Sequence, residues 1–286
     1  MTRLIRAELL KLRTTNTWWL FGIGAFLTLA LAFLVNAVQA HQFLHESPPT
    51  PQNASPAEVA RIQEQFAAQH HVYQQAANVF TSGQFFGCMF IMLLGMLMIT
   101  NEYYHQMATT TYLTTPHRST VVLGKLGTAM IAAAFLLLAT TVLNLVAGSI
   151  FFSSVEHISP PLGDWTVQRA ILLNLVAYAL WAVFGVGFGA LIRNQLAATI
   201  TGTLAYVFGT QVAQGVFFLI FTFWIKKTWV LTAMVSVPAV ASQVMISPNK
   251  MYPESPPQWV GAAVLIGYGL LAGAIGTWIL RRRDIS

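Results

Sequence analysis

The chain opens with Arg3-Leu4-Ile5-Arg6-Ala7-Glu8-Leu9-Leu10-Lys11-Leu12-Arg13-Thr14-Thr15-Asn16-Thr17-Trp18-Trp19, which runs directly into an apolar segment. At about 100° per residue, Ile5, Leu9 and Leu12 fall on one side of a helix. The basic residues Arg3, Arg6, Lys11 and Arg13 spread over the other side. This pattern is typical of an amphipathic helix on an anionic membrane surface, and the two tryptophans mark the interface. The stretch predicts a chain that begins on the cytoplasmic face and then turns into the bilayer.

Composition also indicates a membrane protein. Of 286 residues, 56% are hydrophobic and only 8% are charged, whereas soluble domains carry about 25% charged residues. The formal net charge of +6 does not indicate nucleic-acid binding, because the positive charges sit beside apolar segments and form no separate soluble face. Cys88 is the single cysteine, which leaves this sequence without an intrachain disulfide or a cysteine-based zinc site.

Six apolar segments approach the length of about 20 residues that a membrane-spanning helix needs. They lie at about 18–38, 79–100, 121–151, 168–192, 196–223 and 258–280. We therefore predict an all-α membrane protein with six transmembrane helices in a single domain, 1–286. Six crossings place both termini on the same side of the membrane.

The distribution of basic residues favours the cytoplasmic side for both termini. With six spans, ten of the fifteen Lys and Arg residues fall on the side of the termini, as the positive-inside rule expects. We expect a multi-pass protein of the cell membrane. Val38-Gln39-Ala40 resembles a signal-peptidase site, but the apolar run before it is longer than a signal peptide requires, so we expect an anchor that is retained.

Two segments outside the spans carry structure of their own. In the external segment 39–78, Ser55-Pro56-Ala57-Glu58 forms a capping box, and apolar residues follow it at helical spacing, which predicts an external helix. In the external segment 224–257, Pro238 interrupts an apolar run. A seventh crossing would place the C-terminal arginines outside, so we favour a re-entrant or interfacial helix pair.

The cytoplasmic loop 101–120 is polar and rich in hydroxyl groups, with Glu102 near one end and Arg118 near the other. Its middle can form a short helix that Pro116 stops. From the residues alone, the loop is either a handle for a soluble partner or a plain solvated connector.

The loop and the opening stretch Ala7 to Thr15 resemble the permease subunit of bacterial ATP-binding-cassette (ABC) exporters of the type-two permease superfamily, in an actinobacterial-like form. The loop positions that match are Glu102-Tyr103, His105, Thr110-Thr111, Leu113, Thr115-Pro116 and Arg118. Tyr104, Gln106 and Met107 depart from the Arg, Gly and Thr that such loops commonly carry. The six spans and the N-terminal helix extend the resemblance over nearly the whole chain.

The resemblance implies an exporter of a hydrophobic or amphipathic compound, such as a drug, an antibiotic peptide or a lipid-like molecule. Residues 1–17 would form an elbow helix that carries Arg3, Arg6, Glu8, Lys11 and Arg13. The loop would hold a coupling helix that docks on a separate ATPase through Glu102, Tyr103, His105, Thr110, Thr111, Leu113, Pro116 and Arg118. Two permeases, identical or homologous, and two ATPase subunits would form the working unit within membrane lipid.

The sequence contains no phosphate-binding loop. This chain is therefore not expected to be an enzyme or to bind a cofactor, and ATP and Mg would bind in the partner ATPase. The resemblance also implies that spans two and five line the transport pathway. Candidate pathway residues are Phe85, Met89, Met92, Gln211 and Gln214. Packing or lipid contact for the first three, and hydrogen bonding between helices for the two glutamines, remain alternatives.

His41, His45, His70 and His71 lie in the external segment, where three of them would meet if the segment folded back. Their spacing is a weak metal signature, so solvated histidines and no metal are expected. Two further functions stay open: a membrane anchor or sensor that docks a soluble partner without transport, and a membrane enzyme with a histidine-bound metal.

Overall fold

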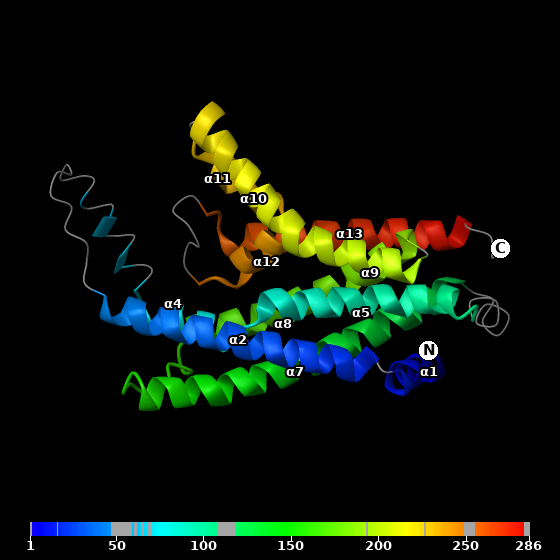
Figure 1. The fold of residues 1–286 in the computed structure, drawn as a ribbon, viewed down its shortest axis with the longest axis horizontal. Coiled ribbons are helices and arrows are strands. Elements are labelled where there is room, and N and C mark those ends of the chain that lie inside the picture. The colour runs from blue at the N-terminus through cyan, green and yellow to red at the C-terminus, as the bar shows by residue number, and fades with distance from the viewer. Residues whose placement is uncertain are drawn as a thin grey trace.

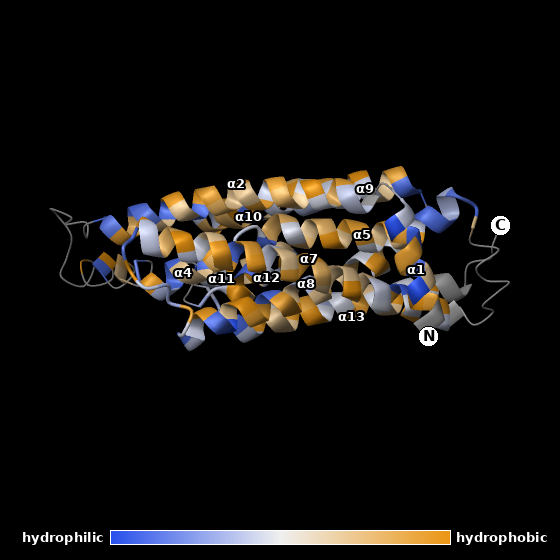
Figure 2. Ribbon diagram, turned by 90° about the horizontal axis from the view of Figure 1, so that it is seen from below, coloured by the Kyte–Doolittle hydropathy of each residue, from blue (hydrophilic) through white to orange (hydrophobic). Residues whose placement is uncertain are grey.

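The structure is a computed structural model that describes residues 2–15, 17–46, 59, 62–63, 66–67, 70–107, 118–192, 194–225, 227–248 and 255–282. Every regular element within these residues is a helix. Six helical stretches are long and apolar enough to cross a membrane: Trp18–His45, Val72–Tyr104, Thr120–Ser154, Trp165–Leu191, Gln195–Trp224 and Gln258–Gly276. Hydrophobic residues fill the length of the bundle and hydrophilic residues gather toward its two ends (Figure 2). The predicted all-α membrane architecture with six spans is confirmed.

Helix α1 (Thr2–Thr14) precedes the bundle, and α2 (Thr17–His45) is the first span. The second span consists of α4 (Val72–Phe80) and α5 (Gln84–Tyr104), the third is α7 (Arg118–Ser154), the fourth is α8 (Trp165–Leu191) and the last is α13 (Gln258–Arg282). The fifth span joins α9 (Gln195–Leu204), η1 (Ala205–Gly209), α10 (Thr210–Leu219) and η2 (Ile220–Trp224). Both ends of the chain lie at the same end of the bundle (Figure 1). We call this the terminal end and the opposite one the far end.

Helix α5 lies at the centre of the bundle and packs most extensively against α8. Small residues allow this close approach, because Gly185 and Gly189 of α8 lie four residues apart on one face. A Cβ atom on Gly185 would collide with the backbone carbonyl of Met92, and one on Gly189 would lie 2.8 Å from the Cα atom of Met96. The two backbones therefore touch along the middle of the bundle.

The second span is broken at Thr81–Gly83, where Gly83 adopts a left-handed backbone conformation with φ of 78°. Neighbouring helices supply donors to carbonyl groups at the break. Asn36 Nδ2 of α2 donates to the Asn78 carbonyl at 3.2 Å, and Asn144 Nδ2 of α7 donates to the Ser82 carbonyl at 2.9 Å. Asn36 and Asn144 thus form hydrogen bonds between helices and satisfy backbone groups that lipid would leave unpaired.

A bent helix pair precedes the last span. Its first part holds α11 (Trp229–Thr232) and η3 (Ala233–Ser236), and its second part is α12 (Pro238–Ile246). The parts meet at 102°, with Pro238 at the first position of α12. The pair lies between the fifth span and α13 (Figure 1). Its bend fits either a broken span or a re-entrant segment, and the re-entrant reading stays a prediction from the sequence.

Two boundaries differ from those expected. The first span continues past residue 38 to His45, and the second begins at Val72 rather than 79. Both extensions lie in the segment that the sequence assigns to an external region. The capping box at residues 55–58 lies outside the described residues. The described residues that follow it, at 59, 62–63 and 66–67, are helical.

Candidate functional site

Four charged side chains meet at the terminal end, where α1 contacts α5 and α7. Lys125 Nζ lies 2.9 Å from Glu8 Oε2 and 3.0 Å from Glu102 Oε1. Lys11 Nζ lies 2.8 Å from Glu8 Oε1 and 3.1 Å from Glu102 Oε1. The ammonium group of Lys125, whose side chain is only 2% exposed, also donates to the Met98 carbonyl at 2.8 Å. We call Glu8, Lys11, Glu102 and Lys125 the basal cluster.

The charges of the basal cluster balance, which offsets the cost of removing them from water. Burial alone would raise the pKa of the Glu8 carboxyl, but Lys125 and Lys11 outweigh burial and hold this pKa below its ordinary value. Burial likewise acts to lower the pKa of Lys11, but Glu8 and Glu102 outweigh it and raise this pKa. Glu8 and Lys11 therefore carry their charges at neutral pH and tie α1 to the bundle.

Apolar contacts support the same attachment. A Cβ atom on Gly124 of α7 would collide with the side chain of Leu4, and one on Gly127 would lie 3.3 Å from the Cδ1 atom of Ile5. Part of the apolar side of α1 thus packs on α7, in addition to any surface it offers to lipid.

The residues expected in the elbow helix occupy two environments. Glu8 and Lys11 belong to the basal cluster, whereas Arg6 and Arg13 are exposed. Arg3 lies in α1, and its side chain is outside the described residues.

The residues expected to contact an ATPase are only partly described. Glu102 faces inward in the basal cluster because two lysines hold its carboxylate, so its side chain offers little surface to a partner. Tyr103 is half-buried and His105, directly after α5, is exposed. Four of these residues, Thr110, Thr111, Leu113 and Pro116, lie outside the described residues, as does the side chain of Arg118.

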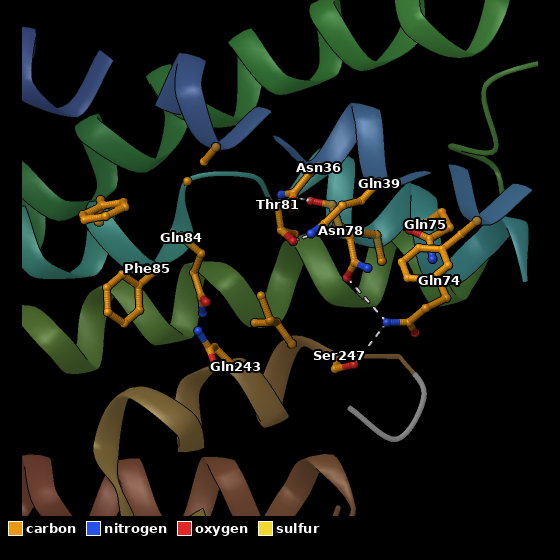
Figure 3. A pocket seen from close by; sticks show the side chains of 16 residues that line it. Asn36, Gln39, Gln74, Gln75, Asn78, Thr81, Gln84, Phe85, Gln243 and Ser247 are labelled. Atoms are coloured by element: carbon orange, nitrogen blue, oxygen red, sulfur yellow. Dashed lines mark hydrogen bonds between the residues drawn. The ribbon is translucent and has the colours of Figure 1, made fainter. Parts of the chain in front are cut away.

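A polar cavity of about 560 Å³ opens between α2, α4, the break and α12 (Figure 3). Among the described residues, its lining contains seven side-chain amides and no Asp, Glu, Lys or Arg; the amides are Asn36, Gln39, Gln74, Gln75, Asn78, Gln84 and Gln243. Gln74 Nε2 donates to Ser247 Oγ at 3.3 Å, and Gln84 Nε2 donates to the Ser242 carbonyl at 3.3 Å. These bonds join the second span to the segment of the bent helix pair, and the wall offers both donors and acceptors without net charge.

A second cavity of about 440 Å³ lies between α5, α8 and the fifth span. Methionine and aromatic side chains dominate its wall, which includes Met92, Met96, Trp181, Phe184, Phe188 and Tyr206. The Trp181 side chain is 3% exposed, and its Nε1 atom has no hydrogen-bond partner among the described residues. The wall of this cavity therefore offers a ligand a mainly apolar surface.

One contact joins the walls of the two cavities. Phe85 lines the polar cavity and Tyr206 lines the apolar one. Their ring centroids are 4.8 Å apart, and the Tyr206 hydroxyl donates to the Phe85 carbonyl at 2.7 Å. The two cavities therefore adjoin along α5 at this aromatic pair.

The candidate pathway residues divide between the cavities and the outside of the bundle. Phe85 and Met92 each line a cavity, and Met89 lies in the core near them. Gln211 is exposed and Gln214 is half-buried, and neither lines the two cavities. The amides of the polar cavity were missed because most lie in or next to the segment assigned outside the membrane. The spacing of Gln74 and Asn78, four residues apart before an apolar span, was the available signal.

These features define a multi-pass helical membrane protein with internal cavities and an attached N-terminal helix. Residues 4–211 match the model of the family described as "ABC-2 family transporter protein", so the chain belongs to this family of ABC-2 permeases. The expected membership of the type-two permease superfamily is confirmed. A search of curated proteins finds no match to the chain. Family membership supports a transport subunit in the membrane that associates with an ABC ATPase. Membrane subunits of this family are generally not catalytic themselves.

Proposed function

We propose that this chain is the membrane subunit of an ATP-driven exporter that moves a hydrophobic or amphipathic compound out of the cell. The observation that carries this proposal is the pair of adjoining cavities along α5, one lined by amides and one by methionine and aromatic side chains. Membership of the ABC-2 family supports the transport role.

The chemistry of the cavities narrows the substrate class. Methionine and aromatic side chains adapt to apolar bodies of varied shape. The amides favour neutral hydrogen-bonding groups. Among the described residues, neither cavity is lined by a Lys, Arg, Asp or Glu, so a highly charged compound would lose hydration without a compensating ion pair from them. The substrate we propose is an amphipathic drug, antibiotic peptide or lipid-like compound.

The basal cluster supports a route for coupling. Lys125 and Lys11 join α1 to the end of α5, and α5 leads from there toward both cavities. In the proposed exporter two ATPase subunits bind ATP and Mg on the cytoplasmic side, beneath the loop after α5. Their movement would reach α5 and α1 together because these helices share the cluster. The excess of Lys and Arg at this end supports the cytoplasmic placement of both termini.

The fifth span supports a second permease, identical or homologous. Only 11% of its most apolar stretch is buried within the chain, and α10 leans away from the bundle (Figure 1). Gln211 is exposed on this span. Because a side-chain amide at membrane depth gains from a protein partner, this face fits an interface between permeases.

The test is reconstitution of the chain in vesicles with an ABC ATPase encoded beside it. We expect ATP-dependent accumulation of a neutral fluorescent lipopeptide in inside-out vesicles. Phe188→Ala, which removes an aromatic side chain from the apolar cavity, should reduce accumulation several-fold, whereas Phe223→Ala at an exposed position should not. A stable complex that hydrolyses ATP without moving any amphipathic probe would overturn the exporter proposal and favour an anchor or sensor.

A further inference from the structure

Three side chains with metal-binding chemistry converge at the far end of the bundle. His41 and His45 lie one turn apart near the end of α2, and Glu156 follows α7. His41 Nδ1 lies 2.8 Å from Glu156 Oε1, and His45 Nε2 lies 3.1 Å from Glu156 Oε2. One ligand atom from each residue lies within 4.8 Å of the other two. We call His41, His45 and Glu156 the far-end triad.

Packing beneath the triad holds its two supporting segments together. Ala37 and Ala40 of α2 belong to the same buried cluster as Phe151 and Phe152 of α7. Directly after α7, the chain turns back, with the Ile158 amide donating to the Phe152 carbonyl at 3.0 Å and His157 at a positive φ of 54°. The backbones that carry the three side chains are therefore positioned before any ligand binds.

The three side chains of the far-end triad differ in how far they are exposed. The Glu156 side chain is 3% exposed, whereas those of His41 and His45 are 52% and 61% exposed. A buried carboxylate requires compensation, and within the described residues the two imidazoles supply it. The exposed imidazoles leave the site open to an ion and to water from the far end.

Two imidazoles and one carboxylate form a ligand set that zinc accepts. Tetrahedral coordination with bonds of about 2.0–2.1 Å places neighbouring ligand atoms roughly 3.3 Å apart. Each imidazole lies close to that spacing from one carboxylate oxygen, His41 Nδ1 from Oε1 at 2.8 Å and His45 Nε2 from Oε2 at 3.1 Å. The ligand atoms lie within 4.8 Å of one another, so a metal would draw the imidazoles together, and half-exposed side chains allow this movement.

We propose that the far-end triad binds a divalent metal of the zinc class, with His41, His45 and Glu156 as protein ligands and water in the remaining position. The metal ties the end of α2 to the end of α7. This site goes beyond the transport proposal and requires neither an ATPase nor a substrate.

His70 and His71, the other histidines of the external segment 39–78, do not join the triad. His70 Nε2 lies 3.4 Å from Glu46 Oε2, and its ring stacks on Phe66. His71 caps α4 by accepting from the Tyr73 amide at 3.4 Å. A site built from the external histidines alone, which the sequence left open, is therefore not formed by these side chains, and His71 provides a matched control.

The experiment uses the purified full chain in detergent, first stripped of metal with a chelator. Co²⁺ is titrated and its visible absorption is recorded, and Zn²⁺ affinity is measured by competition with a chromophoric chelator. We expect one ion per chain and a spectrum typical of nitrogen and oxygen ligands. Glu156→Gln and the double variant His41→Asn/His45→Asn should bind at least about ten-fold more weakly, and His71→Asn should bind like the parent.

Thermal unfolding provides a second readout, because a ligand that binds only the folded state stabilises it. Zn²⁺ should raise the melting temperature of the parent and of His71→Asn but not that of the triad variants. If Glu156→Gln does not fold, the half-exposed His41→Asn still decides the question. Equal Zn²⁺ affinity in parent and triad variants, or no saturable binding in the parent, would show that the triad is only an ion pair.

Discussion

The hydroxyl of Tyr206 in the fifth span donates a 2.7 Å hydrogen bond to the backbone carbonyl of Phe85 at the start of α5. The two residues come from spans that are distant in sequence, and each lines a different cavity. Their contact joins the least buried span to the most buried one. Any movement of the fifth span away from α5 must therefore break this bond.

Tyr206→Phe should lower the free energy of unfolding by about 1 kcal/mol, because it removes one hydrogen bond and leaves the ring in place. The measurement is denaturation in mixed micelles followed by circular dichroism. Tyr268→Phe is the matched control, since its hydroxyl donates to the Ser236 carbonyl at 3.0 Å from an exposed position. An equal or larger loss in the control would contradict the structural importance assigned to the Tyr206 bond.

Lys125→Met should be strongly destabilising, by about 3–5 kcal/mol, because it removes the buried cation that pairs with both Glu8 and Glu102 and leaves the two carboxylates buried. Lys227→Met removes an exposed lysine at the far end and should change stability by about 0.5 kcal/mol or less. Adding Glu8→Gln to Lys125→Met should recover part of the loss. A double variant less stable than Lys125→Met alone would argue against the basal cluster as described.

Acid should weaken the attachment of α1. The folded-state pKa of Glu8 lies below its ordinary value of 4.5, so its ionised form contributes stability that is present above 4.5 and is lost as the pH falls through the folded-state value. The melting temperature of the parent should therefore fall as the pH is lowered from about 6 to about 3, and Glu8→Gln should show a smaller fall. Parallel pH profiles for the two proteins would disprove the contribution of Glu8.

Gly185→Ala should destabilise the bundle by about 1–3 kcal/mol, because its new methyl group would meet the Met92 backbone in the contact between α5 and α8. Gly267→Ala in α13 adds the same atom where nothing lies within 4 Å and should have little effect. Denaturation of the two variants side by side provides the measurement. If both variants unfold at the parental midpoint, the close backbone contact is not required.

Gln211→Leu tests the proposed interface between permeases. Interhelical hydrogen bonds in membranes contribute about 0.6 kcal/mol on average, so self-association should weaken roughly threefold. Thr222→Ala is the control on the same span, because its hydroxyl donates within its own helix to the Phe218 carbonyl at 2.9 Å. Energy transfer between labelled chains in vesicles measures the association. Unchanged transfer in Gln211→Leu would place the interface elsewhere.

The six spans could be predicted because apolar length is a property of each segment by itself. The break within the second span could not, since Thr81, Ser82 and Gly83 interrupt an otherwise continuous apolar run only weakly. Its stability depends on Asn36 and Asn144, which arrive from two other helices. The local sequence around each asparagine does not indicate which backbone group it binds.

The sites were harder to predict because their members are far apart in sequence. Glu8 and Lys125 are separated by 117 residues, and His41 and Glu156 by 115. Gln211 and Gln214 are three residues apart and therefore lie near one another on α10. This spacing does not indicate whether that side of the helix faces the bundle or its surroundings. In the fifth span Tyr206 and Thr210 turn inward, and Gln211 therefore points out of the bundle.

The basal cluster also constrains how the protein is made. Glu8 leaves the ribosome 117 residues before Lys125, a delay of roughly 6–25 s at ordinary rates of synthesis. During that interval α1 lacks its partner helix α7, and the Glu8 carboxylate has Lys11 but not Lys125 to balance its charge. A basic amphipathic helix can wait on the surface of anionic lipid, where its apolar side is covered. The arginines that remain exposed in the finished protein thus have a use before the third span is inserted.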